Sequence, residues 1–199
     1  MLETIILSAG QSSRMGRDKA LLDIDGVPAI IHIINKVMHV SDLIYIVLGD
    51  NLDTVKSQVL AFFGDSKKIS FIYNEIHLKG MFSSVQKGFA AISGKNGVML
   101  QLIDQPFISK NVYEELASSY NQENLIMQPS YVMGEVKRGG HPLVFAPEFK
   151  DVVLSYDNDQ QLNDIIKKYQ SRRKFIVVDD ESILHNLNTK KDFNDKLTG

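Results

Sequence analysis

The sequence contains no cysteine, which excludes disulfide bonds, thiolate catalysis and cysteine-ligated zinc. It also has no strong excess of one charge, because 22 Lys and Arg residues against 24 Asp and Glu residues give a net charge of −2. Domains that bind nucleic acid non-specifically are usually basic, so no nucleic-acid partner is expected. No apolar run approaches the roughly 18 residues of a membrane-spanning helix, so no membrane partner is expected either.

The remaining composition is that of an ordinary folded domain. Hydrophobic residues make up 44% of the 199 residues and charged residues 23%, close to globular averages. Residues 1–4 contain no basic run, and the apolar stretch 5–7 is too short for a signal peptide. We therefore expect a cytoplasmic protein. Repeats, low-complexity tracts and Pro- or Gly-rich linkers are missing, which predicts a single domain over residues 1–199.

Short apolar runs alternate with amphipathic segments along the chain. The runs predict strands, and the segments between them predict helices with one apolar stripe. This alternation predicts an α/β fold: a Rossmann-like three-layer α/β/α arrangement with a mostly parallel, mixed central sheet of about seven strands. The predicted strands are 4–7, 43–48, 69–73, 98–103, 125–127, 142–145 and 174–178, and the predicted helices are 29–40, 52–63, 83–92, 111–120 and one that opens with a capping box at 189–192.

Ligands of such sheets bind at the carboxyl ends of the strands, so the loops after Leu7, Tyr73, Ile103 and Val178 are the expected sites of chemistry. The first of these loops, residues 8–19, is small, polar and basic. Its glycines permit a close approach of backbone N–H groups to an anion, and its serines and cations suit phosphate oxygens. It is neither a Walker A loop nor a G-x-G-x-x-G loop. An ordinary surface loop is the alternative, but its position after the first strand favours anion binding.

Three further segments contain candidate functional residues. Asp104 ends a strand and either binds Mg²⁺ or caps the next helix. Ser83 and Ser84 either cap a helix or help its N-terminus to bind an anion. His141 is a general base, a hydrogen-bond donor or a turn residue, and the other histidines show no spacing that would make it a metal ligand.

These motifs together resemble a known family. Leu7, Ala9, Gly10, Ser12, Arg14, Met15, Gly16 and Lys19 match an L-x-A-G-x-S-x-R-M-G-x-x-K signature. The chain resembles the nucleotidyltransferases that include the molybdenum cofactor cytidylyl- and guanylyltransferases, within the superfamily of nucleotide-diphospho-sugar transferase type. Three further motifs of this family follow in order: G-M-x-x-S at 80–84, Asp-Gln-Pro at 104–106 and Gly-His-Pro at 140–142.

The resemblance implies roles for named residues. It implies catalytic roles for Arg14, Lys19 and Asp104, and a Mg²⁺ site, with Mn²⁺ as the alternative ion, at Asp104 and Asn188. The implied acceptor-binding residues are Gln105, Pro106, Gly140, His141 and Pro142. The implied nucleotide-binding residues are Leu7, Ser8, Ala9, Gly10, Gln11, Ser12, Ser13, Arg14, Lys19, Gly80, Met81 and Ser84.

The implied reaction moves a nucleoside monophosphate from a nucleoside triphosphate to a phosphorylated acceptor and releases pyrophosphate. Ala9-Gly10 is typical of the cytidylyl branch, whereas the guanylyl branch has Gly-Gly, so CTP is favoured over GTP and molybdopterin is the favoured acceptor. A guanylyltransferase of the molybdenum cofactor, a sugar-phosphate nucleotidyltransferase and a non-catalytic nucleotide- or cofactor-binding protein are the alternatives. The protein is expected to be a monomer or a dimer.

Two segments depart from the family pattern. Asn186 and Asn188 stand where the cytidylyl branch has aspartates, and an amide oxygen coordinates a metal without supplying charge. Residues 158–163 replace a G-D-x-G-A-R acceptor motif, of which only Asp159 remains. Asp179 and Asp180 are interpreted as part of a solvated turn; the alternative is that they compensate for the charge that the two asparagines do not supply.

Overall fold

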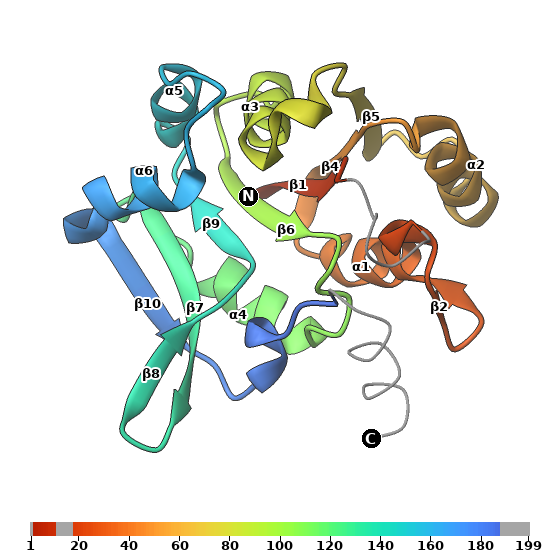
Figure 1. Ribbon diagram of the computed structural model, residues 1–199. Coiled ribbons are helices and arrows are strands. Elements are labelled where there is room, and N and C mark those ends of the chain that lie inside the picture. Colours follow the sequence, from red (N-terminus) through yellow and green to blue (C-terminus); the bar gives the residue numbers. More distant parts are fainter. Residues whose placement is uncertain (1, 11–17, 188–199) are drawn as a thin grey trace.

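The computed structural model describes residues 2–10 and 18–187, and a central mixed sheet organises them (Figure 1). The order of its strands is β10-β7-β9-β6-β1-β4-β5, and β8 also pairs with β7. Only β9 among the paired strands of this order runs antiparallel to both neighbours, so the sheet is mostly parallel, as predicted. The strands are β1 (Leu2–Ser8), β4 (Ser41–Leu48), β5 (Ile69–Tyr73), β6 (Gly97–Leu102), β7 (Ile126–Met133), β8 (Val136–Gly139), β9 (Leu143–Phe145) and β10 (Arg173–Val177).

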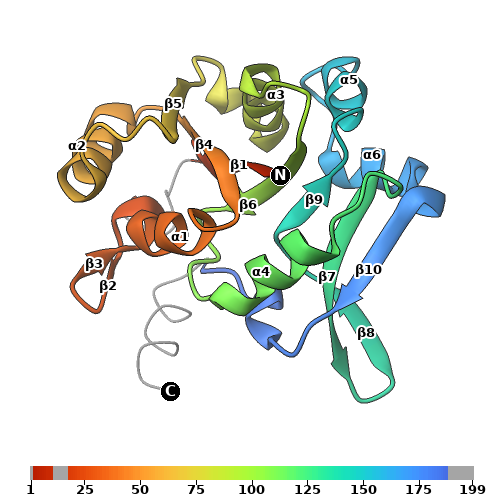
Figure 2. The same cartoon turned by 180° about the vertical axis from the view of Figure 1, so that it is seen from behind.

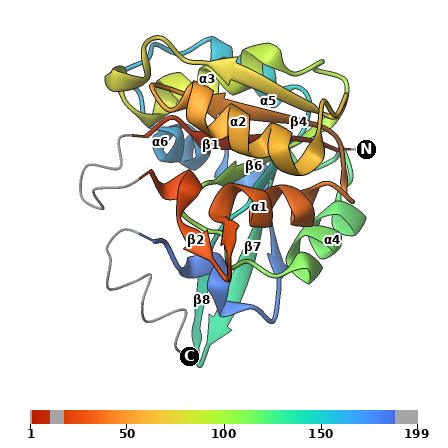
Figure 3. The ribbon, with the colours of Figure 1, turned by 90° about the vertical axis from the view of Figure 1, so that its right-hand side faces the viewer.

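Helices cover both faces of the sheet and complete the predicted three layers (Figures 1 and 2). On one face lie α1 (Ala29–Val37), α2 (Leu52–Phe63) and α4 (Lys110–Ser119). On the other lie α3 (Met81–Ala91), α5 (Phe149–Leu154) and α6 (Leu162–Lys168). In the side view of Figure 3, α3 and α5 lie above β1 and β6, whereas α1 and α4 lie below these two central strands. Of the helices in this described part, none has the length and apolarity that a membrane crossing requires.

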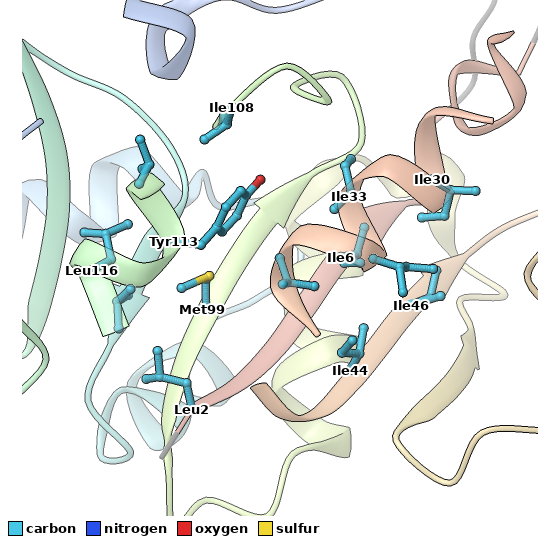
Figure 4. Close-up of a cluster of buried hydrophobic side chains, with 14 of the residues drawn as sticks. Leu2, Ile6, Ile30, Ile33, Ile44, Ile46, Met99, Ile108, Tyr113 and Leu116 are labelled. Atoms are coloured by element: carbon cyan, nitrogen blue, oxygen red, sulfur yellow. The ribbon is translucent and has the colours of Figure 1, made fainter. Parts of the chain in front are cut away.

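Both faces of the central strands are apolar because both are covered. Ile5 and Ile6 of β1 are fully buried, yet they belong to different core clusters, since successive side chains of a strand point to opposite faces. Figure 4 shows the cluster on the α1 side, where Ile6 lies with Ile30 of α1 and Ile46 of β4. Each such burial stabilises the fold by about 1.5–3 kcal/mol. This packing fixes where the loops after the strands emerge.

The elements that the sequence did not predict are short or polar. Helices α5 and α6 are six and seven residues long, and all four residues of β8 are exposed, so their apolar periodicity is weak. A small hairpin also went unpredicted; its turn has positive φ at Asp25 and Gly26. It comprises β2 (Asp23–Ile24) and β3 (Val27–Pro28), and the unpredicted 3₁₀ helices are η1 (Lys19–Leu21), η2 (His77–Lys79), η3 (Gln170–Arg172) and η4 (Glu181–Leu184). The predicted helix at 189–192 lies outside the described residues.

Candidate nucleotide-binding and active site

A pocket of about 330 Å³ opens where β1 and β6 end, between the first loop and the start of α3. Nine predicted site residues line it together: Leu7, Ser8, Ala9, Gly10, Lys19, Gly80, Met81, Ser84 and Asp104. The other lining residues were not predicted as site residues; they are Asp18, His77, Leu78, Leu102 and Ile103. The predicted site residues Gln11, Ser12, Ser13 and Arg14 lie outside the part of the chain that the structure describes.

Lys19 and Asp104 meet in this pocket. The Nζ atom of Lys19, in η1, lies 3.4 Å from Oδ2 of Asp104, which follows β6. The other carboxylate oxygen, Oδ1, is buried and has no hydrogen-bond partner among the described residues. A buried carboxylate oxygen without a donor is costly unless a cation or a ligand satisfies it. Asp104 does not cap the following helix, because the N-cap residue of α4 is Ser109; that alternative was wrong.

Asn188, the second implied metal ligand, comes directly after Leu187 in the sequence, and Leu187 contacts Asp104. The backbone N–H of Leu187 donates to the carbonyl oxygen of Asp104 at 2.7 Å, so the chain that leads into Asn188 passes beside Asp104. Asn188 itself is outside the described range. Among the residues that are described, no three His, Asp or Glu side chains gather into a metal centre. A single carboxylate such as that of Asp104 still fits Mg²⁺, because proteins commonly hold this ion through one or two carboxylates while it keeps several waters.

Asn51 joins the two ends of the first loop. Its Nδ2 donates to the carbonyl oxygen of Ser8 at 2.9 Å and to Oδ2 of Asp18 at 2.7 Å, and its Oδ1 accepts the N–H of Gly49 at 3.1 Å. Asp18 in turn accepts the N–H of Ala20 and so begins η1. One amide side chain thus connects the end of β1, the end of β4 and the segment that contains Lys19. Its role was not visible in the sequence, because the contacts join positions 33 and 43 residues apart.

The start of α3 is organised by the buried Asn74. Its Nδ2 donates to Oγ of Ser83 and to Oγ of Ser84, both at 2.9 Å. Ser83 donates to the carbonyl oxygen of Gly80 at 2.8 Å, within the first turn of the helix. Ser83 therefore has a structural role in the helix start, whereas Ser84 lies one residue further on and lines the pocket. Gly80 has φ of 113°, a conformation that glycine adopts far more readily than other residues.

His77 forms part of the pocket wall and was missed by the sequence analysis. Its Nδ1 lies 3.1 Å from the carbonyl oxygen of Asn74, and its Nε2 lies 3.2 Å from Oδ2 of Asp50. Gly49 makes room for the ring, because a Cβ at this position would come within 2.8 Å of the imidazole Cγ. Strands β4 and β5 thus position His77 jointly. Only the glycine at 49 could have indicated this contact in the sequence.

The predicted acceptor residues converge on the C-terminal segment. Nε2 of Gln105 and the backbone N–H of His141 both donate to the carbonyl oxygen of Ile183, at 3.3 and 3.1 Å. Gln105 also donates to Oδ1 of Asn186 at 2.6 Å. A Cβ at Gly140 would collide with the backbone of Ile183, which explains glycine there. Burial lowers the pKa of His141, and the nearby charge of Asp104 opposes this shift. Pro142 follows His141 after a cis peptide bond.

Two charged groups hold the loop after Asp104. Lys36 of α1 donates to the carbonyl oxygen of Pro106 at 2.6 Å; burial lowers its pKa, and the charge of Asp180 acts in the opposite direction. The carboxylate of Asp180 accepts the N–H groups of Ser109 and Ser182, both at 2.9 Å. Burial would raise the pKa of Asp180, but these hydrogen bonds outweigh it and the pKa is lowered. The interpretation of Asp180 as part of a solvated turn was therefore wrong.

Residues 158–163, which depart from the acceptor motif of the cytidylyl branch, lie beside the first pocket. A second pocket of about 340 Å³ shares Gly80 and Met81 with the first. Its remaining lining is Lys79, Phe82, Asn158, Asp159, Gln160, Gln161, Leu162 and Asn163. The two pockets therefore meet at the start of α3.

The arrangement is that of the α/β nucleotidyltransferases, and the comparisons with known proteins agree. A family model described as the MobA-like NTP transferase domain matches residues 4–173, so the chain belongs to that family. Rv0371c from Mycobacterium tuberculosis H37Rv has a similar fold, with a TM-score of 0.81 at 19% identity over 100% of this chain and 98% of that one. A structure of Rv0371c in complex with manganese gives a TM-score of 0.76 at 17% identity over the same shares.

Two curated relatives match parts of the chain. The bifunctional protein GlmU of Methanococcus maripaludis is 28% identical over 165 residues, which cover 79% of this chain and 34% of that protein. A probable molybdenum cofactor guanylyltransferase of Nostoc sp. is 48% identical over 46 residues, which cover 23% of this chain and 22% of that protein. The matches thus span about a third or less of the length of these two relatives.

Proposed function

We propose that this protein transfers a nucleoside monophosphate from a nucleoside triphosphate to a phosphorylated acceptor. The observation that supports this most strongly is the meeting of Lys19 and Asp104 in a pocket whose other walls are the first loop and the start of α3. An oxygen of the acceptor phosphate attacks the α-phosphorus, the bond to the β-phosphate breaks, and pyrophosphate leaves. Such transfers depend on positioning and charge neutralisation more than on covalent catalysis.

Different residues of the chain are assigned to these tasks. Gly10 and Lys19 bind the triphosphate, and Arg14, from the undescribed part of the loop, is assigned to the same task. Asp104 and Asn188 would hold Mg²⁺, and the buried Oδ1 of Asp104, which lacks a donor among the described residues, fits that role. When bound, the metal supplies positive charge to the phosphate oxygens. The acceptor is assigned to the remaining predicted residues, which are Gln105, Pro106, Gly140, His141 and Pro142.

The base and the acceptor are the finer part of the proposal. Ala9 favours CTP, as in the cytidylyl branch, whereas the Nostoc relative is named a guanylyltransferase and Asn186 with Asn188 suits that branch. We keep CTP as the preferred nucleotide and GTP as the alternative. Molybdopterin is the preferred acceptor; a sugar phosphate is the alternative, because residues 158–163 lack the cytidylyl acceptor motif beside the pocket.

A pyrophosphate-release assay tests the proposal. The purified chain is incubated with Mg²⁺, CTP or GTP, and either molybdopterin or a panel of sugar 1-phosphates. Pyrophosphate that forms only with one nucleotide and one acceptor class, and not with Asp104→Asn, supports the transferase. If a nucleotide binds but no combination of nucleotide and acceptor releases pyrophosphate, a non-catalytic binding protein is favoured instead.

A further inference from the structure

The end of the sheet formed by β7, β8 and β10 exposes an unusual number of apolar side chains. Figures 1 and 2 show the β7–β8 hairpin extending away from the helices. Ten large hydrophobic residues are exposed in the described part of the chain, and five of them lie on these three strands: Val132, Met133, Val136, Phe175 and Val177. Isolated apolar residues on a surface are normal, but a cluster of them marks an interaction site.

The strand pairing shows which of these side chains share a face. Phe175 and Val177 pair with Gln128 and Ser130 of β7, and Val132 pairs with Lys137 of β8. Registered partners point to the same side of a sheet, and residues two apart on a strand do too. One face therefore presents a set that we call the Phe175 patch: Val132, Lys137, Arg173, Phe175 and Val177.

Two cations flank the aromatic centre of this patch. Nζ of Lys137 lies 5.1 Å and Cζ of Arg173 lies 4.4 Å from the centre of the Phe175 ring. Arg173 also donates to Oε1 of Gln128. Neither cation has a carboxylate partner among the described residues. Protection of a free sheet edge explains exposed lysines, but it does not explain an exposed phenylalanine and two valines on the sheet face.

The Phe175 patch is small enough to be the centre of an interface rather than the whole of it. It extends about 13 Å along β10 and about 10 Å across three strands, from the usual strand rise and spacing. An aromatic residue at the centre with polar groups around it is the usual anatomy of a protein–protein interface. The patch is also continuous with the proposed acceptor segment, because Gly139 lies against both Gln128 and Phe175, two residues before His141.

The charges decide between possible occupants. In a two-fold symmetric dimer through this face, the patch would meet itself and bring Lys137 and Arg173 near their own copies, which is unfavourable. Nucleic acid interfaces are more polar and more strongly basic than a surface with Val132, Phe175 and Val177 at its centre. A protein that presents acidic side chains around an apolar centre complements both the cations and the apolar groups.

We propose that the Phe175 patch is the docking surface for a different protein, whose contact surface is apolar at its centre and acidic around it. Its location beside the acceptor segment would bring the partner close to the site of transfer. This proposal does not depend on the reaction assigned to the pocket.

Photo-crosslinking in cells of the source organism tests the proposal with the full-length chain. The probe is p-benzoylphenylalanine in place of Phe175, with the same residue in place of Phe62 on α2 as the control, because the two positions are 40% and 50% exposed. Adducts are identified by mass spectrometry, and the partner is then purified. Lys137→Glu and Arg173→Glu test the charges, and Lys56→Glu is the matched control, because Lys56 lies 5.8 Å from the ring centre of Phe71.

The expected result is an adduct at position 175 but not at 62, formed with an acidic segment of another protein. The purified partner should then bind the natural chain at least tenfold more tightly than either charge-reversed variant, with Lys56→Glu unchanged and all melting temperatures alike. The proposal is overturned if adducts at 175 are absent or no stronger than at 62. It is equally overturned if the adducts contain only copies of this chain or nucleic acid, or if charge reversal leaves binding unchanged.

Discussion

Nζ of Lys19 lies 3.4 Å from Oδ2 of Asp104, although 85 residues separate the two along the chain. Strands β1 and β6 are parallel neighbours, so the segments that follow them emerge at one edge of the sheet. Both side chains are 19% exposed, which leaves them accessible to a ligand yet shielded enough for their charges to act strongly.

Lys19→Gln should lower kcat/KM for nucleotidyl transfer by about 10²-fold, since a positioned cation next to phosphate oxygens contributes on that order. Its effect on the free energy of unfolding should stay below about 1 kcal/mol, because a partly exposed ion pair stabilises weakly. Steady-state kinetics and urea unfolding measure both. Lys167→Gln is the control, since Lys167 forms an ion pair of 2.9 Å with Asp164 on the surface of α6. Equal kinetic losses in both variants would contradict the role of Lys19.

Asn51→Asp should raise the KM for the nucleoside triphosphate at least tenfold. The new carboxylate cannot donate to Ser8 or Asp18, and it repels the Asp18 carboxylate, so the two ends of the first loop are no longer held together. Two lost hydrogen bonds also cost roughly 1–3 kcal/mol of stability. Asn124→Asp is the matched control, because Asn124 donates to Asn121 in an exposed loop. An unchanged KM for Asn51→Asp would show that the loop does not need this bridge.

Asp180→Asn should destabilise the fold more at neutral pH than in acid. The pKa of Asp180 is lowered from 3.8 in the folded chain, so the stability it contributes is present above about pH 4. That contribution is lost as the pH falls through 3.8 towards the folded-state value. At pH 7 we expect a difference of roughly 1 kcal/mol, discounted for partial exposure, because an amide oxygen replaces a carboxylate that accepts two N–H groups. Urea unfolding at pH 7 and pH 3 measures this difference; a gap that widens in acid would contradict it.

Ala9→Gly should shift the nucleotide preference towards GTP. Ala9 is buried in the wall of the pocket. Within the family that the sequence resembles, the guanylyl branch has glycine where this chain has Ala9. The ratio of kcat/KM for CTP to that for GTP should fall by about tenfold, the size that a contact difference of 1.4 kcal/mol produces. Competition between the two nucleotides in one reaction measures the ratio directly. An unchanged ratio would mean that the base is selected elsewhere.

The sequence alone predicted the parts of this molecule that depend on local pattern. All seven predicted strands are present, because buried strands such as β1 are continuous apolar runs whose signal needs no tertiary context. The first loop and Asp104 were predicted as parts of one site because parallel strands end at the same edge.

The residues that sequence reasoning missed act through distant contacts. Asn51 joins Ser8 to Asp18, and Asn74 bonds two serines of α3, but neither contact leaves a periodic or spaced signal in the sequence. Asp180 was misinterpreted for the same reason: its partner Ser109 is 71 residues away. The roles of Arg14 and Asn188 remain predictions.

The most direct test of the central claim is the melting temperature of the natural chain and of Asp104→Asn with CTP or GTP, in the presence of MgCl₂ or EDTA. A ligand that binds only the folded state at about 100 times its Kd adds roughly 2.7 kcal/mol, which corresponds to about 5–10 °C for a chain of this size. We expect such a rise for the natural chain with one nucleotide and Mg²⁺, and its loss in EDTA and in the variant. No rise at millimolar nucleotide, or an equal rise in Asp104→Asn, would contradict the assignment of this pocket as a metal-dependent nucleotide site.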